Sequence, residues 1–156
     1  VLFRSDYQNI KTINSVGTSS WTDGSVKTGK TYYYKIKTVV KTQNGEQTSG
    51  FSNVKSAKAV PAKTTLKAKA SDAKNVKLTW SKVKGASGYE IYRSNSKDGK
   101  CSKVKTISKG STTSYKNGKL KKSTTYYYKI RAYRKVNGKK VYGSYSSVVS
   151  VKTKAK

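Results

Sequence analysis

The stretch TTYYYKIRAY at residues 124–133 gives the strongest indication of the fold of this chain. Successive side chains of an extended strand point to opposite faces of a sheet. One face of this stretch would hold the aromatic and aliphatic residues Tyr126, Tyr128, Ile130 and Ala132. The other face would hold the mixed aromatic and cationic residues Tyr127, Lys129, Arg131 and Tyr133. The alternation predicts a β-strand with its first face in a core and its second face outside.

Part of this stretch occurs twice in the chain. TYYYKI at residues 31–36 returns as TYYYKI at residues 125–130, and the offset of 94 residues holds from about residue 7 to residue 58. Outside the tyrosines, Ile13 falls on Ile107 at the same offset. This period is longer than that of helical solenoid repeats, and it suits a tandem array of small β-sandwiches.

Two stretches before the second copy of the phrase also alternate. NVKLTW at residues 75–80 places its apolar side chains on one side and its polar side chains on the other. GYEIYRS at residues 88–94 places Glu90 and Tyr92 on the side away from the core. No stretch sustains a 3.6-residue period, so we expect almost no helix.

Turn residues separate the predicted strands. An Asx-Gly pair supplies the positive φ that a tight hairpin needs. The candidate hairpin turns are Asn44-Gly45, Asp98-Gly99, Asn117-Gly118 and Asn137-Gly138. The only proline, Pro61, lies between the two copies in the stretch AKAVPAKTT, which reads as a short, semi-stiff linker.

The second copy resembles a fibronectin type III domain. In LKKSTTYYYKIRA at residues 120–132, Leu120 is followed six residues later by Tyr126 and then by alternating apolar residues that end at Ala132. This is the family's pattern, and Trp80 matches the tryptophan of its second strand. One departure is that Lys122 and Ser123 replace a frequent Pro-Gly.

The resemblance implies a tyrosine corner, in which a tyrosine hydroxyl bonds to the backbone upstream of it. Tyr126 and Tyr32 occupy the matching positions in the two copies. A buried phenol needs such a partner for its hydroxyl group.

The resemblance also predicts the domain organisation. It covers residues 63–153 fully, but it covers residues 1–58 only from the third strand onward. We therefore expect an all-β chain of two tandem immunoglobulin-like, fibronectin type III β-sandwiches, the first of which lacks its first two strands. The expected parts are a partial domain at 1–58, a linker at 59–63 and a complete domain at 64–156. The inner face of the partial domain should be incompletely covered, which predicts that this domain is marginal or unfolded alone.

The charge of the chain is lopsided. It has 35 Lys and Arg against 6 Asp and Glu, a net charge of +29, and lysine dominates. Such a charge attracts polyanions, but it is equally consistent with a solvated surface. Lysine is a strongly hydrated point charge without the bidentate fork of arginine, and no nucleic-acid reader motif accompanies it. We therefore expect no specific nucleic-acid partner, and no apolar run is long enough to predict a membrane span.

The inventory of reactive side chains argues against catalysis. The chain has no histidine, and Cys101 is its only cysteine, so no internal disulfide is possible. The six acids are scattered without local pairing, at Asp6, Asp23, Glu46, Asp72, Glu90 and Asp98. No phosphate loop or zinc spacing is present. We expect a protein that is not an enzyme, with no catalytic residue, no metal and no cofactor. An intramolecular Lys–Asn crosslink would need a buried carboxylic acid beside the two side chains. Glu90 is expected to face outward, so we expect no such crosslink.

The remaining candidate site is the outer face of the predicted sheet. Aromatic rings interleaved with cations can stack on sugars and attract anions, but they also form ordinary cross-strand pairs. The candidate residues are Tyr92, Tyr127, Lys129, Arg131 and Tyr133.

Two functions stay open. The chain is rich in Lys, Tyr and Ser, and in this composition it resembles modules of large secreted proteins of Gram-positive bacteria. The resemblance implies secretion or a cell-surface location. The first function is a non-catalytic spacer or presentation module of a larger extracellular or cell-surface bacterial protein, whose partners are the neighbouring domains of the same polypeptide. The alternative is a module that binds anionic cell-wall polymer or glycan through the Lys/Tyr-rich sheet face.

Overall fold

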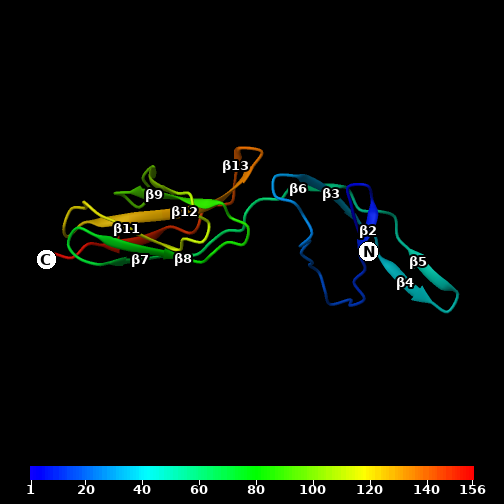
Figure 1. Ribbon diagram of the computed structural model, residues 1–156. Coiled ribbons are helices and arrows are strands. Elements are labelled where there is room, and N and C mark those ends of the chain that lie inside the picture. The colour runs from blue at the N-terminus through cyan, green and yellow to red at the C-terminus, as the bar shows by residue number, and fades with distance from the viewer. The chain divides into compact units, whose positions relative to one another are not determined.

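The computed structural model describes residues 1–156, which form fourteen strands and no helix (Figure 1). The prediction of an all-β protein is therefore confirmed. The chain divides into two compact units, Val1–Ala59 (unit 1) and Val60–Lys156 (unit 2). No helix of the structure has the length and apolarity needed to cross a membrane.

Unit 2 contains two antiparallel sheets. In the three-stranded sheet the order is β11-β8-β7, from β7 (Leu66–Ala70), β8 (Val76–Trp80) and β11 (Ser114–Asn117). In the five-stranded sheet the order is β10-β9-β12-β13, and β14 also pairs with β12. Its strands are β9 (Gly88–Ser94), β10 (Ser102–Ile107), β12 (Thr125–Val136), β13 (Lys139–Tyr142) and β14 (Val149–Lys152).

The core of unit 2 lies between its two sheets. From the five-stranded sheet come the inward side chains predicted for residues 124–133, namely Tyr126, Tyr128, Ile130 and Ala132, all buried. From the three-stranded sheet come Val76, Leu78 and Trp80, which alternate with exposed or half-buried polar residues along β8. The period-two pattern of the sequence thus assigns these core residues correctly.

Unit 1 contains one four-stranded sheet and a separate hairpin. The order of the sheet is β2-β1-β3-β6, from β1 (Leu2–Arg4), β2 (Gln8–Lys11), β3 (Thr31–Ile36) and β6 (Lys55–Lys58). The hairpin pairs β4 (Val39–Thr42) with β5 (Gly45–Thr48). At the 94-residue offset, β3 and β4 correspond to the two ends of the long strand β12.

Unit 1 has no counterpart of β7 and β8, and no residue of unit 1 is buried. Residues 20–23, the counterpart of β11, form no strand. In unit 2 the backbone of β11 pairs with β8, so without β8 this segment has no partner for its N–H and C=O groups.

Two predicted turns are wrong. Asp98-Gly99 lies within the longer loop between β9 and β10, and neither of its residues has positive φ. The pair Asn137-Gly138 has positive φ at both residues (49° and 76°) and closes the β12–β13 hairpin as predicted. By contrast, Asn117 is the last residue of β11 and its side chain is buried, so Asn117-Gly118 is not a hairpin turn.

Candidate functional site

Glu90 lies at the centre of the predicted aromatic and cationic face of unit 2. Its side chain is on the outer side of the five-stranded sheet, as the alternation predicted, but it is only 1% exposed. Donors from four strands converge on its carboxylate, and together they form what we call the Glu90 cluster. Its members are Tyr92 at 2.7 Å, Arg131 at 2.9 Å, Lys140 at 3.0 Å, Tyr142 at 3.2 Å and Lys103 at 3.5 Å.

The Glu90 cluster holds its carboxylate in the charged form. Burial by itself raises the pKa of Glu90, but hydrogen bonds from Tyr92, Arg131 and Lys140 outweigh burial and lower the pKa to about 2. Burial and the neighbouring carboxylate both raise the pKa of Tyr92. A carboxylate held so firmly as an anion is poorly suited to donate a proton in general acid catalysis.

Arg131 is enclosed by aromatic rings. Its guanidinium carbon lies 3.7 Å from the ring centroid of Tyr142, 4.9 Å from that of Tyr145 and 5.3 Å from that of Tyr92. The Lys129 ammonium lies 4.4 Å from the centroid of Tyr145. The cations expected to face a ligand are therefore already engaged with carboxylate and rings of the same unit.

Tyr133 corrects the predicted surface. It was expected on the outside, but it is 1% exposed. Its hydroxyl donates to the carbonyl of Ile107 at 3.3 Å, and its ring lies 6.2 Å from the ring of Tyr142 and 4.5 Å from the Lys140 ammonium. Of the five predicted residues, Tyr92 and Arg131 bond to the Glu90 carboxylate and Tyr133 is buried. The other two, Tyr127 and Lys129, are half-buried and form no bond to that carboxylate.

The residues that sequence reasoning missed come from the β12–β13 hairpin and the segment after it. The two-residue turn Asn137-Gly138 sets Tyr142 opposite Tyr133. This register follows from the turn length, so the sequence contained a signal for the position of Tyr142. No sequence signal places Lys103 and Tyr145 in the same group.

The two tyrosine-corner positions have the same geometry. The Tyr126 hydroxyl accepts a hydrogen bond from the backbone N–H of Lys121 at 2.9 Å. The Tyr32 hydroxyl accepts one from the backbone N–H of Lys27 at 3.0 Å. Each tyrosine thus ties the loop five residues upstream to its strand.

A second polar group beside each corner is also duplicated. In unit 2, Arg93 and Tyr128 both donate to Oδ1 of Asn117, at 3.2 and 2.8 Å. In unit 1, Arg4 and Tyr34 both donate to Oδ2 of Asp23, at 2.7 and 3.1 Å. Sequence reasoning missed both groups, because Asn117 was assigned to a turn.

Asp23 is held as an anion in unit 1. Burial raises its pKa, but hydrogen bonds from the Ser25 hydroxyl and backbone, from Arg4 and from Tyr34 lower the pKa to about 2. Neither Asp23 nor Glu90 has a second carboxylate among its hydrogen-bond partners. No three His, Cys, Asp or Glu side chains gather into a candidate metal site anywhere in the chain.

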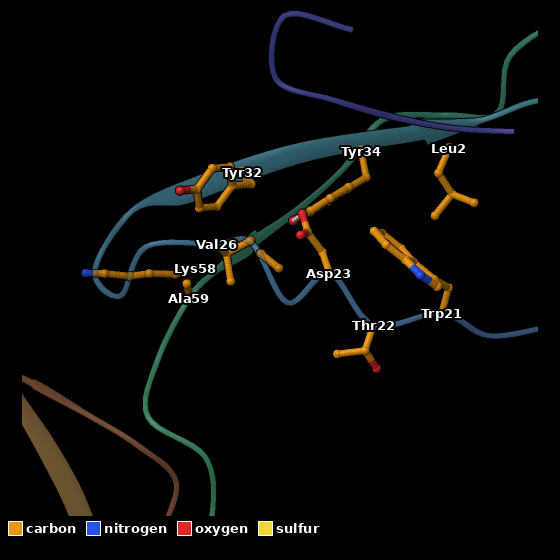
Figure 2. Close-up of a pocket in the computed structure, with 10 residues that line it drawn as sticks. Leu2, Trp21, Thr22, Asp23, Val26, Tyr32, Tyr34, Lys58 and Ala59 are labelled. Carbon is orange, nitrogen blue, oxygen red and sulfur yellow. Dashed lines mark hydrogen bonds between the residues drawn. The ribbon is translucent and has the colours of Figure 1, made fainter. Parts of the chain in front are cut away.

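The inner face of unit 1 is an open groove with a volume of about 360 Å³. Figure 2 shows Leu2, Trp21, Val26 and Tyr32 around the Asp23 group. Trp21 is 37% exposed. In unit 2 the equivalent space is filled by the side chains of β7 and β8. The groove is therefore the uncovered inner face of a sheet.

Solved structures with a similar fold are fibronectin type III domains. One is the FN1–FN3 domains of chicken CNTN1, at 22% identity and a TM-score of 0.53; the match covers 86% of this chain and 46% of that one. A second is the 6th fibronectin type III domain from human fibronectin type III domain containing protein 3, at 18% identity and a TM-score of 0.53, covering 64% and 92%. A third is FN3tt, at 21% and 0.50, covering 63% and 99%. No family model and no curated protein matches the chain.

Proposed function

We propose that this chain, which has the fibronectin type III fold, is a non-catalytic spacer or presentation module of a larger extracellular or cell-surface bacterial protein. The observation that carries the proposal is the position of the two ends of unit 2. The backbone of Pro61, at the start, packs against Gly143 at one end of the sandwich. The backbone N–H of Lys154, at the other terminus, bonds to the carbonyl of Asp72 beyond the far end of β7 (Figure 1). Because the polypeptide enters unit 2 at one end of the sandwich and leaves at the opposite end, unit 2 would separate the domains before and after it by the length of the sandwich.

The exit of unit 2 is firmly attached. Strand β14 pairs with β12 over four residues, from Val149 to Lys152. Beyond it, the Thr153 hydroxyl donates to the carbonyl of Lys121 at 2.7 Å and accepts from the N–H of Thr124 at 3.0 Å. A pull on the C-terminal side would have to shear these bonds together, which suits a module that transmits position along a polypeptide.

The hydrogen bonding of the acids Glu90 and Asp23 supports a structural role. Both Glu90 and Asp23 have their oxygens occupied by donors of the same unit. The extracellular, Gram-positive-type location and the neighbouring domains as partners rest on the Lys-, Tyr- and Ser-rich style of the sequence. Labelling of intact producing cells by an antibody against this chain tests the location, and labelling only after lysis would overturn it.

Spin-label distances test the spacer geometry on the full chain. In a Cys101→Ser background, Lys63→Cys with Lys152→Cys, at an exposed position of β14, should give one long, narrow distance distribution that does not change with salt. Lys63→Cys with Ser147→Cys is the matched control, since the Lys63 ammonium lies 3.4 Å from the Ser147 hydroxyl. A broad distribution for the first pair, or one as short as the control, would overturn the proposal.

A further inference from the structure

Three lysines stand in line across the outer face of the three-stranded sheet of unit 2. Lys69 on β7 is directly opposite Lys77 on β8, and Lys77 is directly opposite Lys116 on β11. All three side chains are exposed. Neighbouring strands are about 4.7–4.9 Å apart, so this lysine row places three ammonium groups on a short line across the strands.

The lysine row has no counter-charge within the sheet. The next rung on the same face holds Lys67, Thr79 and Ser114, which adds a fourth cation and two hydroxyls. None of the four lysines forms one of the chain's ion pairs, which are Arg4–Asp23 and the three pairs of Glu90. The loop acid Asp72 accepts bonds from the N–H of Lys74 and the side-chain amide of Asn75, which lower its pKa, and the charge of Lys116 lowers it further. Asp72 forms no ion pair with Lys116.

The cations on the two outer faces of unit 2 therefore have different surroundings. On the five-stranded sheet, Arg131, Lys103 and Lys140 surround Glu90. On the three-stranded sheet, like charges lie directly opposite each other, which destabilises a sheet. The row is also specific to unit 2, because the counterpart of Lys116 at the 94-residue offset is Thr22. An anion bound along the row would relieve this repulsion.

We propose that the lysine row is a docking surface for a linear phosphodiester polyanion of the polyol-phosphate type, bound through its phosphates. Lysine ammonium groups on flexible stems suit phosphates whose orientation is not fixed. The face offers no ring for a base or sugar, since Tyr115 of β11 packs against the core. Stacking platforms are what single-stranded nucleic-acid binders add to charge, so this face recognises the polymer backbone alone. The surface lies beyond the spacer role and does not depend on it.

Counterion release gives the expected salt dependence. Each neutralised phosphate on a single-stranded polyanion contributes about 0.7 to the slope of log affinity against log salt. Three contacts give a slope of about 2, so the affinity should fall roughly 20-fold between 50 and 200 mM salt. Replacing the three lysines should remove most of this slope.

The test compares two triple variants of the full chain, each with the same loss of charge. The row variant is Lys69→Gln, Lys77→Gln, Lys116→Gln, and the scattered control is Lys82→Gln, Lys109→Gln, Lys139→Gln, at exposed positions. The probe is lipid-free poly(glycerol phosphate), with neutral dextran as a blank. We expect the row variant to lose about tenfold or more in affinity at 50 mM salt, and the control about twofold.

Two outcomes would overturn the proposal. Equal losses in the two variants would show that net charge alone binds the polymer. Oligo(dT) of equal phosphate number binding tenfold more tightly than poly(glycerol phosphate) would assign the surface to nucleic acid. Thermal unfolding controls for folding, because the row variant should unfold at the same temperature as the parent chain or higher once the facing charges are gone.

Discussion

Units 1 and 2 carry the same polar group beside the same tyrosine corner, but only one of them is covered. In unit 2 the acceptor is the neutral Asn117, 7% exposed beneath a closed core. In unit 1 it is the charged Asp23, beside an open groove and ion-paired with Arg4 at 2.7 Å. Both acceptors receive a bond from an arginine, so the difference lies in the cover: water of the open groove helps to solvate the Asp23 carboxylate, whereas Asn117 accepts the same two bonds under the core without a charge to desolvate.

This comparison separates what forms a sheet from what forms a core. In unit 1, β3 pairs with β1 on one side and β6 on the other, as β12 pairs with β9 and β14 in unit 2. Without β7 and β8, however, none of its apolar side chains is removed from water as Tyr128 and Ile130 are. Unit 1 therefore keeps its backbone pairing without a second sheet, but it does not bury its apolar side chains.

The largest expected effect comes from supplying the missing cover. We predict that a copy of residues 60–89, joined directly before Val1, closes the groove and protects unit 1. Each large apolar side chain that becomes fully buried contributes roughly 1.5–3 kcal/mol. In the unmodified chain, limited proteolysis should cut within residues 1–58 and leave a core of about 62–154; with the copy, both units should resist equally.

The matched control for this fusion carries serine at the copied positions of Leu66, Leu78 and Trp80, the inward residues of β7 and β8. It should leave unit 1 as sensitive to protease as before. Equal protection of residues 1–58 in the unmodified monomer would contradict the argument that the groove is an uncovered core face.

The second effect concerns the Glu90 cluster. Glu90→Gln should destabilise unit 2 by about 1.5–3 kcal/mol, the scale of hydrogen bonds to a charged group, while Asp98→Asn at an exposed loop position should change little. Denaturant unfolding at neutral pH measures both. Equal midpoints for the two variants would show that the cluster adds no stability.

Glu90 also predicts a pH dependence. Its pKa in the folded chain is about 2, lowered from the ordinary value of 4.5. Its stabilising contribution is therefore complete above about pH 4.5 and is lost as the pH falls toward 2. Unit 2 should lose stability over this window, and Glu90→Gln should flatten the curve there. A curve that is unchanged by the substitution would contradict the assignment.

A smaller effect is expected at the tyrosine corner. Tyr126→Phe removes the bond between the buried tyrosine ring's hydroxyl and the part-buried N–H of Lys121, which costs about 1 kcal/mol. Tyr127→Phe, on the opposite and half-buried face, should cost much less. Thermal unfolding of the two variants compares them, and the same loss in both would mean that the corner bond is not the source of the difference.

The smallest effect should come from replacing the charged acceptor of unit 1, Asp23, with the neutral acceptor found in unit 2. Asp23→Asn keeps one oxygen, which accepts from Arg4 and Tyr34 as Asn117 does in unit 2, and removes an ion pair with partial solvent access, worth about 0–1 kcal/mol. Its amide NH2 takes the place of the oxygen that accepted from the exposed Ser25 N–H, so that bond is lost. Amide exchange at Ser25, whose N–H bonds to Asp23 at 2.9 Å, measures the change. Complete loss of protection across β3 would show that the charge organises unit 1.

The strands, their inward faces and the duplication could be predicted from local sequence patterns. Alternation placed Tyr126, Tyr128 and Ile130 in the core, and Asn137-Gly138 fixed a hairpin, because both signals are local in the chain. The burial of Glu90 and Tyr133 could not be predicted in this way, because their cover comes from Tyr142, Lys140 and the neighbouring strand β10. Only the tertiary structure shows that Asn117 is an acceptor in the core, and that Lys69, Lys77 and Lys116 form one row. Periodicity assigns a side chain to a face, whereas the cover over that face and the register across it are set by strands distant in sequence.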